Sequence, residues 1–284
     1  MGPAERYWAM DRDEVFQREI DFHRQVARRL MENLAPVPPR VVQRYALSRH
    51  WRMFPKEAVF HFIRRHARDR ERVEVCEFGC GDGVNCCEIA LAIPRAHCFG
   101  FDLSPDLIQV ARARARLNRV EDRVEFVVAN AERDPLQGRR FDVMLALAVI
   151  HHLDIGAVLP TLLKGVRPGG LLIFSEPVAF SPLLQRLRNL LPVDKEVSPD
   201  ERQLSREEVE SLCAPLERPR VFYYRLFSRL CRLLPHADNI EEHPLTGMVV
   251  RFLFRLDSWL LAAIPFLRRF AGHVLIVGRR PEKD

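Results

Sequence analysis

The sequence has no run of about eighteen apolar residues, the length that a membrane-spanning helix requires. Its first residues, MGPAER, include two charged side chains and lack the apolar core of a secretory leader. Its seven cysteines form no C-x-x-C pair and precede no H-x-H arrangement, so the pattern does not indicate a zinc site and favours reduced thiols. These absences predict a cytoplasmic protein without a bound metal.

Charge is unevenly distributed. Residues 1–72 hold 16 Lys and Arg against 10 Asp and Glu, and this excess equals the formal net charge of +6 of the whole chain. A basic segment can contact nucleic acid, an anionic membrane surface or an acidic substrate. The acidic residues are interleaved with the basic ones, which favours an ordinary solvated helical surface. The length of 284 residues accommodates one large α/β domain with insertions, or a domain plus a cap.

Residues 73–83, VEVCEFGCGDG, read as a buried strand that runs directly into a glycine-rich turn. Glycines at 79, 81 and 83 allow the backbone to turn tightly and to approach a ligand without interference from a Cβ atom. Residues 84–93 then carry apolar side chains at the spacing of one helical face. Strand, turn and helix N-terminus together predict a cradle for a nucleotide-like cofactor.

The glycine spacing indicates which cofactor this is. A dinucleotide fingerprint, G-x-G-x-x-G, would need glycine where the sequence has Val84. The spacing G-x-G-x-G, with Glu77 before it and Asp102 at the end of the next predicted strand, resembles the class I S-adenosylmethionine-dependent methyltransferases. The resemblance covers roughly residues 73–178 and returns near 273–278. It implies an α/β fold with a doubly wound, mainly parallel sheet of seven strands, of which the last is antiparallel.

The resemblance also implies where the cofactor, S-adenosyl-L-methionine, would be held. Asp102 would accept hydrogen bonds from both ribose hydroxyls, because a carboxylate offers two oxygens. Asn130 stands where the family usually has an aspartate that accepts from the adenine amino group, and its amide oxygen can still accept. The expected cofactor-binding set is Glu77, Gly79, Cys80, Gly81, Asp82, Gly83, Asp102, Leu103, Asn130, Ala131 and Leu147.

Two further residues are candidates for the chemistry. Residues 141–153 read as a central parallel strand, apolar on both faces, followed by a turn. The resemblance places His151, in that turn, near the transferred methyl group, and Glu176 follows the next strand at the same crevice. His151 is the leading general base because its ordinary pKa of about 6.5 suits proton removal near neutrality. Glu176 would orient His151 or act as the base itself, and His152 remains an alternative because a turn cannot be phased from sequence.

Outside the core, the pattern predicts helices on both sides of the cofactor-binding half. The first two, at 12–34 and 56–67, flank an aromatic cluster at 51–55 that either lines a pocket or packs the cap. Two arginine-rich amphipathic helices, at 225–234 and 249–263, form an insertion before the last strand. A lid over an apolar substrate is favoured for this insertion, ahead of packing on the cap or contact with a membrane surface. The expected boundaries are a cap at 1–72, a core at 73–180, further core elements with the lid at 181–270, and the final strand and tail at 271–284; a turn is expected at 166–170.

The preferred function is methyl transfer to an oxygen or carbon atom of an apolar or amphiphilic small molecule. An RNA or protein methyltransferase would explain the basic first segment, but the sequence has no recognisable reader module, so nucleic acid is not the expected partner. A membrane-surface lipid methyltransferase would explain the insertion. A non-catalytic cofactor-binding protein is disfavoured because every cofactor element except the change from Asp to Asn is present. The sequence leaves the oligomeric state open.

Overall fold

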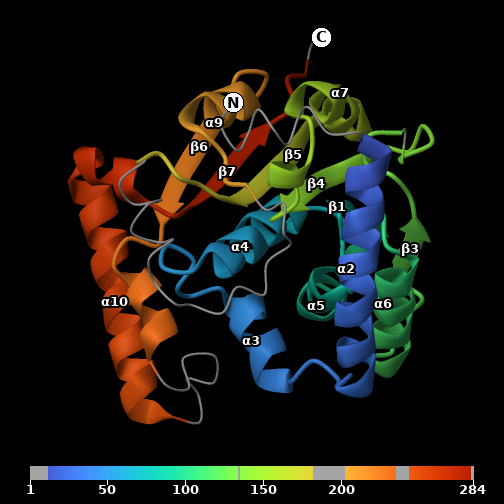
Figure 1. The fold of residues 1–284 in the computed structure, drawn as a ribbon, viewed down its shortest axis with the longest axis horizontal. Helices are drawn as coiled ribbons and strands as arrows, with labels where there is room; N and C mark the ends of the chain where they lie inside the picture. Colours follow the sequence, from blue (N-terminus) through green and yellow to red (C-terminus); the bar gives the residue numbers. More distant parts are fainter. Residues whose placement is uncertain (1–11, 134, 182–201, 235–242, 283–284) are drawn as a thin grey trace.

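The computed structural model describes residues 12–133, 135–181, 202–234 and 243–282. One seven-stranded sheet crosses the molecule in the order β3-β2-β1-β4-β5-β7-β6 (Figure 1). The first five strands run parallel, whereas β7 is antiparallel to both of its neighbours, which confirms the predicted fold class. The strands are β1 Val73–Phe78, β2 Ala96–Asp102, β3 Val124–Val128, β4 Phe141–Leu147, β5 Val166–Pro177, β6 Glu217–Tyr224 and β7 His273–Arg279.

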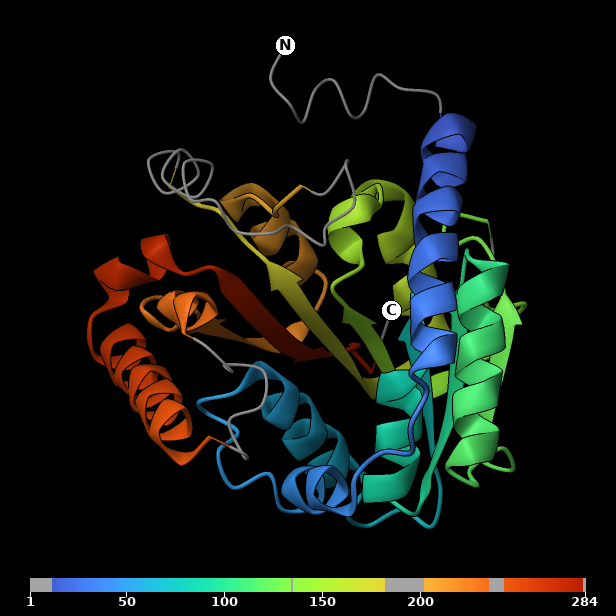
Figure 2. The same cartoon turned by 60° about the horizontal axis from the view of Figure 1, so that its bottom comes forward.

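Helices cover both faces of the sheet (Figures 1 and 2). Helices α4, α5 and α6 pack into one apolar cluster on one face, and α7 and α9 pack into a second cluster on the other. No helix in the described ranges is both long and apolar enough to cross a membrane. The helices are α2 Arg12–Glu32, α3 Pro39–Leu47, α4 Pro55–Ala67, α5 Val84–Ala92, α6 Pro105–Leu117, η1 Ile150–His152, α7 Ile155–Gly165, α9 Arg206–Cys213, η2 Ser228–Leu233, α10 Pro244–Ala263 and η4 Pro265–Phe270. The first eleven residues of the expected cap lie outside the described residues.

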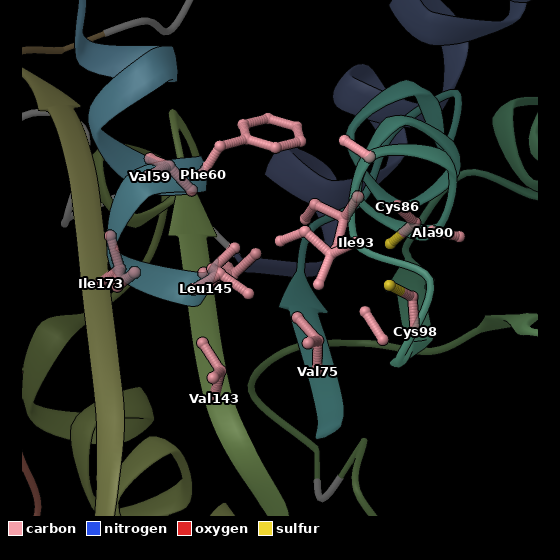
Figure 3. Packing of buried hydrophobic residues seen from close by; sticks show 14 of the residues in the cluster. Val59, Phe60, Val75, Cys86, Ala90, Ile93, Cys98, Val143, Leu145 and Ile173 are labelled. Atoms are coloured by element: carbon pink, nitrogen blue, oxygen red, sulfur yellow. The ribbon is translucent and has the colours of Figure 1, made fainter. Parts of the chain in front are cut away.

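The central strand β4 is buried on both faces, as its continuous apolar run predicts. Val143 and Leu145 belong to the cluster under α4 and α5, while Met144 and Ala146 belong to the cluster on the other face. Figure 3 shows Val143 and Leu145 lying between Val75 of β1 and Ile173 of β5. Because neighbouring parallel strands end at one edge, this core fixes the relative positions of the loops that follow β1, β2, β4 and β5.

Capping residues stand at the starts of two helices. The Ser104 side chain accepts a hydrogen bond from the backbone N–H of Leu107, and Pro105 occupies the first position of α6. Ser205 and Glu208 form both bonds of a capping box at the start of α9. Each cap satisfies backbone N–H groups that the first turn of a helix leaves without partners.

The prediction of a turn at 166–170 is wrong. These residues belong to β5, whose pairing with β4 changes from Phe141 opposite Val166 to Val143 opposite Leu171. One residue separates the paired positions on β4 and four separate them on β5, so the extra residues form an irregularity within the strand. Gly169 takes φ +69° there, and its N–H donates to Arg280 O at 3.0 Å. The Pro-Gly-Gly signal therefore marks a bulge and not the start of the strand.

The prediction of an arginine-rich α-helix at 225–234 is also wrong, because only the short 3₁₀ helix η2 forms there. Asp257 of α10 accepts hydrogen bonds from the backbone N–H groups of Leu226 at 2.8 Å, Phe227 at 2.8 Å and Ser228 at 3.0 Å. These bonds to a buried carboxylate hold the chain in a turn before η2. An amphipathic pattern alone cannot reveal such a distant partner.

We expect His66 of α4 to make folding stability depend on pH. Neither of its buried ring nitrogens has a hydrogen-bond partner among the described residues, and burial lowers the His66 pKa to about 4, with Arg70 and Arg279 adding to the shift. Between about pH 6.5 and this value the unfolded chain binds a proton that the folded chain does not, so stability falls as pH falls. Relative to His66→Phe, the wild type should lose about 3 kcal/mol of unfolding free energy across that window.

Urea unfolding of both proteins from about pH 8 to pH 4 measures this difference. Above about pH 7 the difference between the two free energies of unfolding should be constant, because His66 is neutral in both states there. If the free energies of unfolding of the two proteins differ by the same amount at every pH down to about 4, His66 is protonated in the folded protein as it is in the unfolded chain, which contradicts the prediction.

Candidate functional site

The turn after β1 takes a left-handed backbone conformation at its three glycines, with φ of 68° at Gly79, 53° at Gly81 and 71° at Gly83. A Cβ atom at Gly79 would lie 2.3 Å from a methyl carbon of Val149, and one at Gly83 would lie 2.6 Å from the Phe126 ring. At Gly81, by contrast, no heavy atom lies within 4 Å of the Cβ position. Packing therefore excludes a side chain at Gly79 and at Gly83. Gly81 faces open space that a ligand can enter.

Asp102, at the end of β2, closes this turn. Its Oδ2 accepts a hydrogen bond from the Gly81 N–H at 2.9 Å, and its Oδ1 accepts one from the Ser104 N–H at 2.9 Å. Leu103 lies between Asp102 and Ser104 in the sequence. Burial raises the Asp102 pKa, and the Ser104 and Gly81 bonds oppose that shift. Each carboxylate oxygen can accept more than one hydrogen bond, so Asp102 retains acceptor capacity for ligand hydroxyls.

Asp82 and Cys80 have roles within the protein. The Asp82 carboxylate and the Arg114 guanidinium of α6 form an ion pair, and Arg114 Nε also donates to the Asp82 carbonyl at 3.1 Å. Arg114 is absent from the predicted set, because its position 32 residues further along the chain carries no local signal. The Cys80 N–H donates to Phe101 O at 2.9 Å, and burial raises the pKa of the Cys80 thiol well above its usual range.

Glu77 lies buried beneath the turn. It accepts hydrogen bonds from Asn85 Nδ2 at 2.7 Å and from Cys86 Sγ at 3.1 Å, so it joins β1 to the first turn of α5. Burial raises the Glu77 pKa to about 7, while the bonds from Asn85 and Cys86 and the charge of Lys56 oppose the shift. Glu77 thus supports the glycine turn from below.

The remaining predicted cofactor residues lie at the ends of β3 and β4. Asn130 Oδ1 accepts a hydrogen bond from the Glu132 N–H at 2.8 Å, which fixes the turn after β3 and leaves the amide NH₂ as a donor. Ala131 follows it, and both residues are half-buried. Leu147, the half-buried last residue of β4, packs at the margin of the core cluster under α4.

His151 and Glu176 form a buried pair, with His151 Nδ1 2.7 Å from Glu176 Oε2. The second carboxylate oxygen, Oε1, accepts the backbone N–H groups of Val149 and Ile150, each at 3.0 Å. An ionised Glu176 makes Nδ1 the protonated ring nitrogen, which leaves the lone pair on Nε2. The arrangement can therefore receive a proton at Nε2.

His152 does not join this pair. Its ring lies 4.1 Å, centroid to centroid, from that of His151, and its Nδ1 lies 3.7 Å from Glu19 Oε1 of α2. Burial, together with the neighbouring His151, lowers the His152 pKa to about 3. The charge of His23, also on α2, opposes the rise in the Asp102 pKa. Helix α2 packs beside α6 (Figures 1 and 2), which brings the predicted cap close to the edge where Asp102 and His152 lie.

The aromatic cluster at 51–55 packs the cap against the sheet. The Trp51 ring stacks on His61 at a centroid separation of 4.5 Å and meets Phe62 at 5.7 Å and Phe222 of β6 at 5.8 Å. Phe54 contacts Phe254 of α10 at 4.7 Å. Of the two roles left open by the sequence, these contacts support packing of the cap.

The chain is similar to known methyltransferases in sequence and in fold. Residues 69–216, just over half of the chain, match the family described as Methyltransferase domain. Norajmaline N-methyltransferase of Rauvolfia serpentina is 26% identical over 137 residues, which cover 48% of this chain and 44% of that protein. A ubiquinone biosynthesis O-methyltransferase of Azorhizobium caulinodans is 34% identical over 112 residues, which cover 39% of this chain and 43% of that protein. The chain thus spans less than half the length of these two curated relatives.

The fold recurs in solved structures. The geranyl diphosphate C-methyltransferase of Streptomyces coelicolor A3(2) superposes with a TM-score of 0.53 at 16% identity, covering 79% of each chain. The names of these three proteins specify transfer to nitrogen, oxygen and carbon. Similarity of fold therefore does not determine the atom that receives the group.

Proposed function

Because this chain belongs to the class I S-adenosylmethionine-dependent methyltransferases, we propose that it transfers a methyl group to an oxygen or carbon atom of a small apolar or amphiphilic molecule. S-adenosylmethionine is the cofactor, and when bound it supplies an electrophilic methyl group on a sulfonium centre. The observation that carries the proposal is the buried pair of His151 and Glu176, with Nδ1 and Oε2 2.7 Å apart. His151 lies in the segment after β4, whose Val149 contacts Gly79 of the glycine turn, and Glu176 lies near the end of β5.

The cofactor fits the residues of the crevice in two respects. The open space in front of Gly81 allows a ligand to approach the backbone of the turn. Asp102 has spare acceptor capacity for the two ribose hydroxyls at the end of the adjacent strand. We assign adenine recognition to Asn130 and Ala131. We place Leu147 beside the methionyl group of the cofactor. Glu77, Cys80, Asp82 and Leu103 hold these contacting residues in place.

The protein's own chemical contribution is to position the acceptor and to take up its proton. Holding two reactants in line can lower a barrier by about 7 to 11 kcal/mol without any covalent intermediate on the enzyme. The acceptor's proton passes to Nε2 of His151, and the neighbouring Glu176 carboxylate stabilises the imidazolium that forms. Glu176 therefore acts as a positioning residue in this proposal, and His151 as the base.

A small acceptor is supported by the names of the similar proteins, which refer to norajmaline and to ubiquinone biosynthesis. The N/D-P-P-Y motif of adenine-amino methyltransferases is absent after β4, where the sequence reads ALAVIHHL. RNA and protein acceptors are the alternative class. An assay with methyl-labelled cofactor distinguishes them from small-molecule acceptors.

Calorimetry tests the cofactor assignment. S-adenosylmethionine and its demethylated product should each bind with a dissociation constant in the micromolar range, about −8 kcal/mol. Methyl-labelled cofactor should then transfer label to a fraction of small apolar metabolites, with total RNA and a protein extract as parallel acceptors. Binding of a nicotinamide dinucleotide without binding of either cofactor form would contradict the assignment, and label in RNA or protein alone would contradict the acceptor class.

A further inference from the structure

Large apolar side chains are exposed together on one side of the molecule. Of fourteen such exposed side chains in the described ranges, ten lie between residues 227 and 266. Four of them are more than 60% exposed. Single exposed apolar residues are ordinary, but a contiguous group of them marks an interaction surface. We call this surface the α10 face and define it by Leu230 and Leu233 of η2, Leu245, Met248, Phe252 and Trp259 of α10, and Phe266 of η4.

The helix α10 is apolar on two sides. Its inner side buries Gly247, Val250 and Leu261 against the rest of the chain. Its outer side carries Leu245, Met248, Phe252 and Trp259 at spacings of three, four and seven residues, which place them in one stripe along the helix. Ordinary surface helices carry polar residues on that outer side.

The stripe is held outward by the buried carboxylate of Asp257. Its three backbone hydrogen bonds, at 2.8 to 3.0 Å, join α10 to the turn before η2. Figure 1 shows α10 at the margin of the molecule with η2 beside its lower half and η4 following its upper end. Phe252 is 62% exposed and Trp259 is 63% exposed on the outer side of this anchored helix.

The charge beside this stripe has one sign. Exposed Arg251 and Arg255 border it on α10. Asp257 is the sole carboxylate among the described side chains of η2, α10 and η4, and it is buried. The described arginines of the three elements are Arg229, Arg251, Arg255, Arg268 and Arg269.

A hollow of about 550 Å³ adjoins the upper end of α10. Three arginines line it, Arg206 of α9 and Arg268 and Arg269 of η4, together with aromatic rings that include Phe266 of the α10 face. The guanidinium groups of Arg206 and Arg268 lie over the rings of Phe180, at 5.5 Å, and Tyr223, at 5.8 Å. Arginine forks suit the geometry of a phosphate group, and this hollow offers three of them.

We propose that the α10 face docks on the surface of an anionic phospholipid bilayer, with α10 lying in the plane of the interface and lipid phosphate groups entering the arginine-lined hollow. A helix with Trp, Phe and Leu on one side and arginines at its border binds such interfaces through apolar burial and attraction to anionic lipid. A second copy of this chain fits less well, because an isologous contact through the stripe would bring Arg251 and Arg255 of one copy close to the same arginines of the other. The inference stands independently of methyl transfer.

Co-sedimentation of the full chain with vesicles tests the proposal. Vesicles of phosphatidylcholine with about 30% phosphatidylglycerol should pellet at least ~10-fold more protein than phosphatidylcholine alone. Raising the salt from about 50 mM to about 500 mM should reduce the bound fraction. Phe252→Ser with Trp259→Ser, and separately Arg251→Gln with Arg255→Gln, should each weaken binding at least ~10-fold.

Matched changes elsewhere control for general loss of surface hydrophobicity or charge. Leu117→Ser with Val128→Ser replaces apolar side chains that are 43% and 51% exposed, and Arg28→Gln with Arg116→Gln removes two exposed charges. Both control pairs should pellet like the wild type. Cofactor binding in solution, measured by calorimetry on every variant, separates failure of this proposal from failure of the proposed enzyme activity.

Three outcomes would overturn the proposal. The first is equal sedimentation with neutral and anionic vesicles. The second is equal loss of binding in the control variants. The third is a concentration-dependent dimer that Phe252→Ser abolishes while vesicles pellet no protein, because a second copy would then occupy the α10 face.

Discussion

Replacing His151 with alanine is expected to lower turnover about 100- to 10,000-fold at saturating cofactor, while cofactor affinity is kept. The imidazole Nε2 is the atom that accepts the acceptor's proton in our proposal, and alanine has no group that can replace it. Among the residues that the structure describes, no hydrogen bond joins the imidazole to the glycine turn or to Asp102, so calorimetry with the cofactor should be nearly unchanged. Single-turnover assays with labelled cofactor measure the chemical step directly.

Glu176→Gln tests the same pair without removing the bonds to the loop. Because Oε1 accepts two backbone N–H groups, from Val149 and Ile150, the glutamine amide should keep its oxygen on that side. Its NH₂ group would then face Nδ1 of His151 and donate to it, which moves the ring hydrogen to Nε2. His151 could no longer accept a proton there, so we expect a loss of turnover similar to that of His151→Ala.

His152→Ala is the matched control, since its ring lies beside His151 but contacts Glu19 instead of Glu176. It should keep most of the turnover. Circular dichroism should confirm that all three variants are folded. Near-normal turnover in both His151→Ala and Glu176→Gln would mean that catalysis is by positioning alone, and a loss confined to His152→Ala would reverse the assignment of the base.

Gly81→Val is expected to weaken binding of S-adenosylmethionine at least about 100-fold, or about 2.7 kcal/mol. The position has φ +53° and open space in front of it, so the valine side chain would occupy the volume through which the ligand approaches the turn. Calorimetry measures the affinity. Because a left-handed backbone also disfavours a side chain by roughly 1–2 kcal/mol, some loss of folding stability is expected in addition.

Gly138→Val separates these two effects. Gly138 has φ +77°, no heavy atom within 4 Å of its Cβ position, and a place in the exposed loop before β4. It should therefore lose stability as Gly81→Val does and keep cofactor affinity. Equal affinity in Gly81→Val and the wild type would show that no ligand lies against this part of the turn.

Much of the fold follows from local sequence. Continuous apolar runs identified the central strands, because a parallel strand that is buried on both faces carries apolar side chains on both faces. Ser104 and the pair of Ser205 and Glu208 mark helix starts in the sequence itself, because capping acts within a few residues. Most of what the sequence did not predict depends on distant partners. One missed element is local: the helix α3 begins at Pro39 and was not among the predicted helices, although proline suits the first position of a helix.

The site was predictable to the extent that strand ends determine it. Asp102 and the glycine turn do meet, through the bond from Gly81 N–H, and His151 and Glu176 do meet in a buried pair. The sequence could not show that Arg114 pairs with Asp82, because these residues meet through the packing of α6 against the turn. Nor could it show which of two adjacent histidines contacts Glu176, since that depends on the phase of the 3₁₀ turn η1.

The contact between Gly79 and Val149 links the two halves of the crevice mechanically. Val149 fills the space where Gly79 lacks a side chain, and its N–H is bound to the carboxylate that also holds His151. Any displacement of the first loop is therefore passed to the second through one methyl group and one hydrogen bond. Energetic effects of substitutions at Gly79 and Glu176 should consequently be non-additive, because both act on the position of the segment around Val149.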